Sequence, residues 1–101
     1  MLRVVYKYPI LFTGDRVSHI SLPLNAEVLS VKLREDYQIV LYALIDPTET
    51  AHKKYSIYAF YTGEVTKEKK MENLKFLDTI IIDNLVYHFF IGDYQDEWIF
   101  K

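Results

Sequence analysis

The sequence predicts an all-β fold, a small antiparallel sandwich or partly open barrel of about seven to eight strands with little helix. Short runs rich in Val, Ile, Tyr and Phe are separated by Pro, Gly, Asp and Asn, which is typical of strands joined by turns. No segment of ten or more residues shows the i, i+3, i+4, i+7 apolar spacing of an amphipathic helix. A chain of 101 residues forms one domain. We expect a β core over residues 1–92 and a tail over residues 93–101.

The first half of the chain contains four predicted strands. Residues 3–8 form the first and end at Pro9, and residues 17–22 form a short or edge strand that Pro23 closes. Residues 27–34 alternate between an apolar and a polar face. Residues 37–45 follow a tight turn at Glu35-Asp36 as the hairpin partner. This fourth run is apolar on both faces, so it is a central strand or one that a partner chain covers.

The second half adds three strands and a tail. Residues 54–62 form an aromatic strand, and the charged stretch 63–73 is a loop or a single helical turn. Residues 74–82 and 85–91 form a hairpin around Asp83-Asn84, for which we expect a type I′ turn. Both arms are apolar on both faces, so a second subunit is expected to pack on this hairpin, with His88 as an interface histidine or the polar group of a shared pocket. The tail carries Trp98 and is expected to dock on the core or on another subunit.

Composition excludes several classes of protein. The net charge of −2 and the pI near 5.9 give no general attraction to phosphate backbones, so we expect no duplex DNA or RNA partner. The chain has no cysteine and therefore no disulfide or thiolate metal site. It has no apolar run of 18 residues and no signal-peptide pattern, so we expect no membrane partner and a cytoplasmic location.

The titratable residues do not form a recognisable catalytic or metal site. The three histidines lack the spacing of metal ligands, no serine lies in a nucleophile elbow, and three glycines cannot build a phosphate loop. Asp78 lies within a strand rather than at a turn, where it either acts as a general base or ligand contact, or faces solvent or pairs with a cross-strand lysine. We predict no catalytic residue, no metal and no cofactor, and hence no enzyme.

Aromatic and basic residues interleave along several strands, in a pattern that suits either a ligand platform or core and interface packing. Rings can stack on bases while lysine or arginine pairs with phosphates. The ligand-binding residues that we predict are four stacking rings, three cations and two hydrogen-bonding groups: Tyr6, Tyr8, Tyr42 and Tyr58; Lys7, Arg34 and Lys54; Thr62 and His88.

The order of several short motifs resembles that of a widespread family of short phage-encoded proteins of unassigned function. The motifs run from Tyr6-Lys7-Tyr8-Pro9 through Leu22-Pro23, 26–31 (AEVLSV), 41–47 (LYALIDP), Thr62-Gly63 and 76–79 (FLDT) to 86–90 (VYHFF). The resemblance covers residues 5–91 and implies a compact β fold and a phage origin. This chain departs from the family at Asp78, where glycine is usual, and in its tail from Tyr94 onward.

The leading functional hypothesis is a non-enzymatic sponge that sequesters a cyclic nucleotide signal of bacterial anti-phage immunity. Proteins of that class are similar to this chain in size and aromatic content, and they usually bind their ligand between subunits, so we expect a homo-oligomer. The alternatives are a module that binds and inhibits a host protein through an exposed strand or the Trp98 tail, and a structural phage protein without a ligand.

Overall fold

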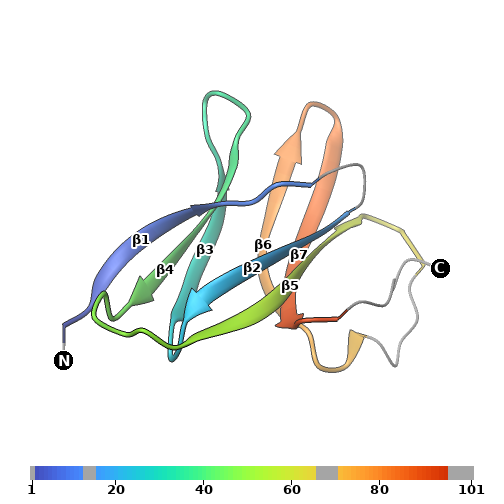
Figure 1. The fold of residues 1–101 in the computed structure, drawn as a ribbon. Coiled ribbons are helices and arrows are strands. Elements are labelled where there is room, and N and C mark those ends of the chain that lie inside the picture. Colours follow the sequence, from blue (N-terminus) through green and yellow to red (C-terminus); the bar gives the residue numbers. More distant parts are fainter. Residues whose placement is uncertain (1, 13–15, 66–70, 96–101) are drawn as a thin grey trace.

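The computed structural model describes residues 2–12, 16–65 and 71–95, which form seven strands in two antiparallel sheets (Figure 1). Sheet A has the order β1-β4-β3 and sheet B the order β2-β5-β7-β6. The two sheets remain separate, so the prediction of a small all-β sandwich is confirmed and closure into a barrel is not observed. In chain order the strands are β1 (Val4–Pro9), β2 (Val17–Pro23), β3 (Glu27–Leu33), β4 (Ile39–Ile45), β5 (His52–Tyr61), β6 (Lys75–Ile82) and β7 (Leu85–Asp93).

The core lies between the two sheets and is built by alternate residues of the central strands. Leu41 and Ala43 of β4 are fully buried, and so is Ile57 of β5. Phe89 and Ile91 of β7 belong to the same cluster. Since successive strand residues point to opposite faces, this alternation decides which of the many apolar residues face the core.

The connection between β3 and β4 is longer than predicted. The Arg34 N–H donates to the Gln38 carbonyl and the Tyr37 N–H donates to the Arg34 carbonyl, which closes a loop over residues 34–38. Tyr37 has a φ of 62° and is exposed, so it belongs to the loop and β4 begins at Ile39. The hydrogen bond from the Tyr37 N–H to the Arg34 carbonyl places Glu35 and Asp36 at the centre of a tight turn, so that prediction is confirmed. The predicted start of the strand at Tyr37 is wrong.

The β6–β7 hairpin is confirmed, with Ile82 paired to Leu85 across the two-residue connection. Asp83 has a φ of 54°, but Asn84 is not among the described residues with positive φ. A type I′ turn needs positive φ at both positions, so that assignment is wrong. Ile80 points into the core while Ile81 is 65% exposed, so near its turn the hairpin is covered on one face within the described chain. Further from the turn, Phe90 packs on the outer face against Tyr58 and Phe60.

Asp78 joins the two sheets along one flank of the sandwich. Its carboxylate lies 3.1 Å from the Lys32 ammonium of β3 and accepts the Val31 N–H. Burial opposes ionisation, but these donors and the Thr79 N–H outweigh it and lower the pKa of Asp78. The expected lysine partner is thus observed, although it comes from the edge of the other sheet. The β6–β7 pairing has a register shift between Phe76 and Asp78, at the position from which Asp78 reaches β3.

The start of the predicted tail docks on the outer face of sheet B. The Gln95 N–H donates to the Ser56 hydroxyl at 3.0 Å, and His19 Nδ1 lies 3.0 Å from the same oxygen. The Tyr94 ring lies edge-on to the His19 ring, 4.8 Å away. Trp98 and the remainder of the tail lie outside the described residues.

Candidate functional site

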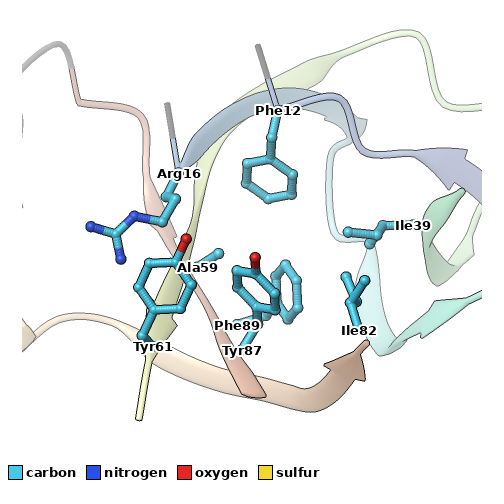
Figure 2. Close-up of a pocket in the computed structure, with 8 residues that line it drawn as sticks. All are labelled: Phe12, Arg16, Ile39, Ala59, Tyr61, Ile82, Tyr87 and Phe89. Atoms are coloured by element: carbon cyan, nitrogen blue, oxygen red, sulfur yellow. The ribbon is translucent and has the colours of Figure 1, made fainter. Parts of the chain in front are cut away.

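A cavity of about 240 Å³ opens at one end of the sandwich, between the inner faces of the two sheets (Figure 2). Both sheets and the segment between β1 and β2 contribute to it. Its lining residues are Phe12, Arg16, Ile39, Ala59, Tyr61, Ile82, Tyr87 and Phe89.

The floor of the cavity is apolar because it continues the core. Phe89 lies opposite Ala59 in the β5–β7 register, and the small alanine side chain leaves space above the sheet. Phe12 covers that space from the other side, with its ring 5.8 Å from the Phe89 ring. Ile39 and Ile82 close the side toward the two hairpin turns, as Figure 2 shows. A planar apolar group would therefore find ring faces and aliphatic groups around it.

Two tyrosines form the polar side of the opening. Tyr61 and Tyr87 are directly paired between β5 and β7, and their ring centroids are 5.0 Å apart. A hydrogen bond with the Tyr61 side chain, together with partial burial, raises the pKa of Tyr87, although the nearby Arg16 charge opposes the rise. A phenol hydroxyl can donate or accept hydrogen bonds.

Arg16 supplies the positive charge at the opening. Its guanidinium carbon lies 4.4 Å from the centroid of the Tyr61 ring, and its Nη1 donates to the Glu64 carboxylate. Glu64 also accepts the Tyr61 N–H at 3.0 Å. Burial disfavours the charged form of Glu64, but these hydrogen bonds outweigh burial and lower the pKa of its carboxyl group. The ionised carboxylate thus holds the guanidinium over the tyrosine ring.

The turn after β5 explains how Glu64 reaches this position. Gly63 has a φ of 83°, a conformation that side chains with a Cβ rarely adopt, and the Glu64 N–H donates to the Tyr61 carbonyl. The chain therefore reverses within three residues and brings the Glu64 side chain beside the strand that it has just left. The Thr62-Gly63 pair seen in the sequence is the local cause of this arrangement.

The predicted site residues of sheet A lie away from the cavity. Tyr6 and Tyr8 share the inner side of β1, with rings 6.5 Å apart, and Tyr8 packs against the core. Lys7 and Tyr42 are paired in register on the outer face of sheet A. Arg34 is exposed in the loop between β3 and β4. The structure therefore does not bring these five residues into one site.

The other four predicted residues lie on the outer face of sheet B. Tyr58 is 0% exposed, so its ring is closed to a ligand in this structure. The Lys54 ammonium lies 5.2 Å from the centroid of the Tyr94 ring. Thr62 and His88 are brought together, with Oγ1 and Nε2 2.7 Å apart.

Sequence reasoning missed Tyr61 and Tyr87 by one residue of strand alternation, since they adjoin the predicted Thr62 and His88. It also missed Arg16, which precedes β2 and is positioned by Glu64. Tyr58 and Tyr61 both lie in an aromatic run whose two faces are equally apolar, so the sequence does not reveal which face is inward. The small Ala59, two residues before Tyr61, is the one available clue, because a small residue among large ones leaves room on its own face.

Residues 2–12, 16–65 and 71–95 contain no group of three His, Asp or Glu side chains placed to hold a metal ion. In the same residues no helix has the length and apolar character needed to cross a membrane. The model of the family described as "Domain of unknown function (DUF7352)" matches residues 1–98. No curated protein and no solved structure matches the chain.

Proposed function

Since the chain belongs to the DUF7352 family, a domain family of unknown function, we propose a function from its cavity: it binds an anionic aromatic ligand without transforming it. The leading candidate is a cyclic nucleotide signal of bacterial anti-phage immunity. In that role the protein is phage-encoded and acts as a sponge in the cytoplasm of the host. The observation that carries the proposal is the guanidinium of Arg16 beside an apolar, ring-walled cavity.

The cavity suits one ring system of such a ligand. Pockets for drug-sized ligands measure about 300–1,000 Å³. At about 240 Å³ this cavity is smaller and accommodates one base, with Phe12 and Tyr87 as ring neighbours. The remaining part of a cyclic nucleotide would lie outside the opening, over Tyr61 and Arg16.

Arg16 can serve the charged part of the ligand. A guanidinium has five N–H donors in a fixed plane and forms short, charge-assisted hydrogen bonds with phosphate oxygens. Glu64 fixes the guanidinium at the opening, so little side-chain entropy is lost when a phosphate binds. The same carboxylate also repels anions, and this favours ligands whose phosphate approaches from the side of Arg16 away from Glu64.

The test is a thermal unfolding assay against a panel of cyclic di- and trinucleotides. A ligand at a hundredfold excess over Kd stabilises the folded state by about 2.7 kcal/mol, which raises Tm by roughly 10–20 °C for a domain of this size. Arg16→Gln should weaken the binding of the stabilising nucleotide at least about tenfold. Arg34→Gln is the matched control, because it removes the same charge from an exposed loop away from the cavity.

Two results would reject the proposal. If no nucleotide of the panel raises Tm, the ligand class is wrong. If a nucleotide binds and Arg16→Gln and Arg34→Gln have equal affinity for it, the cavity is not the site.

A second candidate function is the binding and inhibition of a host protein, and the outer face of sheet A favours it. Val5 is 53% exposed and Leu29 is 46% exposed on this face, with Tyr42 and Leu44 half-buried between them. Apolar and aromatic residues of this kind form the centres of protein interfaces. Val5→Lys and Leu29→Lys should each abolish the capture of the host protein and leave the nucleotide assay unchanged.

A further inference from the structure

Among residues 2–12, 16–65 and 71–95, one exposed face carries no charge. It lies on the outer side of sheet B, where the ends of β5, β6 and β7 meet, and we call it the hairpin face. Ile81 and Val86 pair across β6 and β7, and the Thr62 N–H donates to the Val86 carbonyl, so these three residues form one row. Thr79 and His88 form the next row. Protein interfaces are depleted of charged residues at their centres, as this face is.

The polar groups of the hairpin face satisfy one another. His88 Nε2 lies 2.7 Å from the Thr62 hydroxyl, and His88 Nδ1 lies 3.0 Å from the Thr79 hydroxyl. Both ring nitrogens therefore have partners within the sheet. A polar group can be removed from water at low cost only if its hydrogen bonds are kept. The face can thus be dehydrated without leaving an unpaired atom on the imidazole.

We propose that the hairpin face binds the same face of a second copy of this chain, about a two-fold axis that runs along β7. The chain has a net charge of −2, so two copies approach most easily where neither presents charge. A two-fold axis along β7 exchanges β6 and β5 between the copies. Val86 then meets Val86, His88 meets His88, and Ile81 lies over Thr62 of the second copy.

The face has a projection and a hollow in positions that this axis brings together. Ile81 is 65% exposed on β6. On the other side of β7 a hollow of about 370 Å³ is lined by Tyr61, Thr62, Asn84, Leu85 and Val86. Exchange of β6 with β5 places each Ile81 at the hollow of the other copy. An interface between identical faces requires this kind of self-complementarity.

The same axis makes the association depend on pH. In the part of the chain that the structure describes, the groups that face His88 are Phe60 and Thr62 of β5 and Thr79 of β6, none of which is charged. Among the described residues, the titratable group that this axis places opposite it in the dimer is His88 of the second copy. Protonation of both imidazoles would place two like charges together in a desolvated interface. The dimer should therefore weaken as the pH falls through the range in which histidine gains its charge.

The hairpin face is small, which limits the expected affinity. Stable interfaces bury about 800 Å² on each partner, whereas two short rows on three strands provide less. We therefore expect a dimer with a Kd in the micromolar range or above. The inference does not depend on the ligand of the cavity, so a negative nucleotide assay leaves it standing.

The test is sedimentation equilibrium of the full chain, without ligand, over a protein concentration range of micromolar to millimolar. We expect a monomer–dimer equilibrium at pH 8 with a Kd at least about tenfold higher at pH 5.5. Ile81→Lys should remove the dimer, and Leu29→Lys, a matched control on the outer face of sheet A, should not. His88→Gln should retain the dimer and lose the pH dependence.

Three outcomes would overturn the proposal. They are a monomer at every concentration, a dimer that survives Ile81→Lys, and a dimer whose Kd is the same at both pH values. Far-UV circular dichroism of each variant distinguishes loss of association from loss of folding.

Discussion

The ion pair between Asp78 and Lys32 offers a quantitative test of how the flank of the sandwich is held. In Asp78→Ala the Val31 N–H loses its acceptor, and Val31 is fully buried. An unsatisfied buried donor costs about 1–3 kcal/mol. Loss of the partly exposed ion pair adds up to about 1 kcal/mol, because the Asp78 side chain is 25% exposed. The expected loss of unfolding free energy is therefore about 1–4 kcal/mol, or a fall in Tm of roughly 4–30 °C.

The measurement is urea unfolding at pH 7, followed by far-UV circular dichroism. Asp78→Asn keeps an oxygen that can accept the Val31 N–H, so it should lose only about 1 kcal/mol. Asp93→Ala is the matched control, because its 3.0 Å ion pair with Lys53 has a carboxylate side chain that is 78% exposed. That substitution should leave the unfolding free energy nearly unchanged, because water screens an ion pair this exposed. If Asp78→Ala is no more destabilising than Asp93→Ala, the carboxylate does not hold the two sheets together.

Three other predictions concern pH, the hairpin turn and the core. The pKa values of Asp78 and Glu64 are lowered in the folded protein, so the stability they contribute is present above their unfolded pKa values and is lost as the pH falls through the folded ones. Tm should therefore fall on acidification below about pH 5, and it should fall less steeply in Asp78→Asn. An equal slope in the two proteins would show that Asp78 does not contribute to this pH dependence. Asp83→Gly should keep or slightly raise Tm, whereas Asp83→Val should lower stability by about 1–2 kcal/mol because a β-branched residue is strained at a φ of 54°; equal Tm values would argue against that conformation. Urea unfolding should show that Phe89→Leu lowers the unfolding free energy by about 1–3 kcal/mol and Phe89→Ala by about 3–5 kcal/mol, since this ring is buried between the sheets. If Phe89→Ala leaves the unfolding free energy nearly unchanged, the core is not packed as described.

The strands could be predicted from the sequence because turn residues mark their ends. Pro23, the Asp46-Pro47 pair and Asp83-Asn84 all lie at or next to observed strand ends. The turn at Glu35-Asp36 was predicted, but the start of β4 was placed two residues too early. The reason is that Tyr37 adopts positive φ, which is unusual for a tyrosine and follows from the hydrogen bonds of the closed loop.

The cavity was harder to predict for two physical reasons. The strand β5 is apolar on both faces, so alternation alone does not decide between Tyr58 and Tyr61 as the inward ring. Arg16 gains its position from Glu64, 48 residues further along the chain, and no local pattern reveals a contact of that range. Sequence reasoning did select Thr62 and His88, which the structure joins on the hairpin face, but not the residues that line the cavity.

The interleaved order of the strands affects how the protein folds during synthesis. Sheet A is complete in the chain at Ile45, but sheet B is not complete until Asp93. At roughly 5–20 residues per second, the ribosome needs about 2–10 s to make the 48 residues between those two points. Throughout that interval the apolar side of sheet A, with Leu41 and Ala43, lacks part of the layer that covers it, because β6 and β7 are made last. The nascent chain therefore cannot reach its native state on the ribosome one sheet at a time, and a product that terminates before β7 would expose a surface that chaperones recognise.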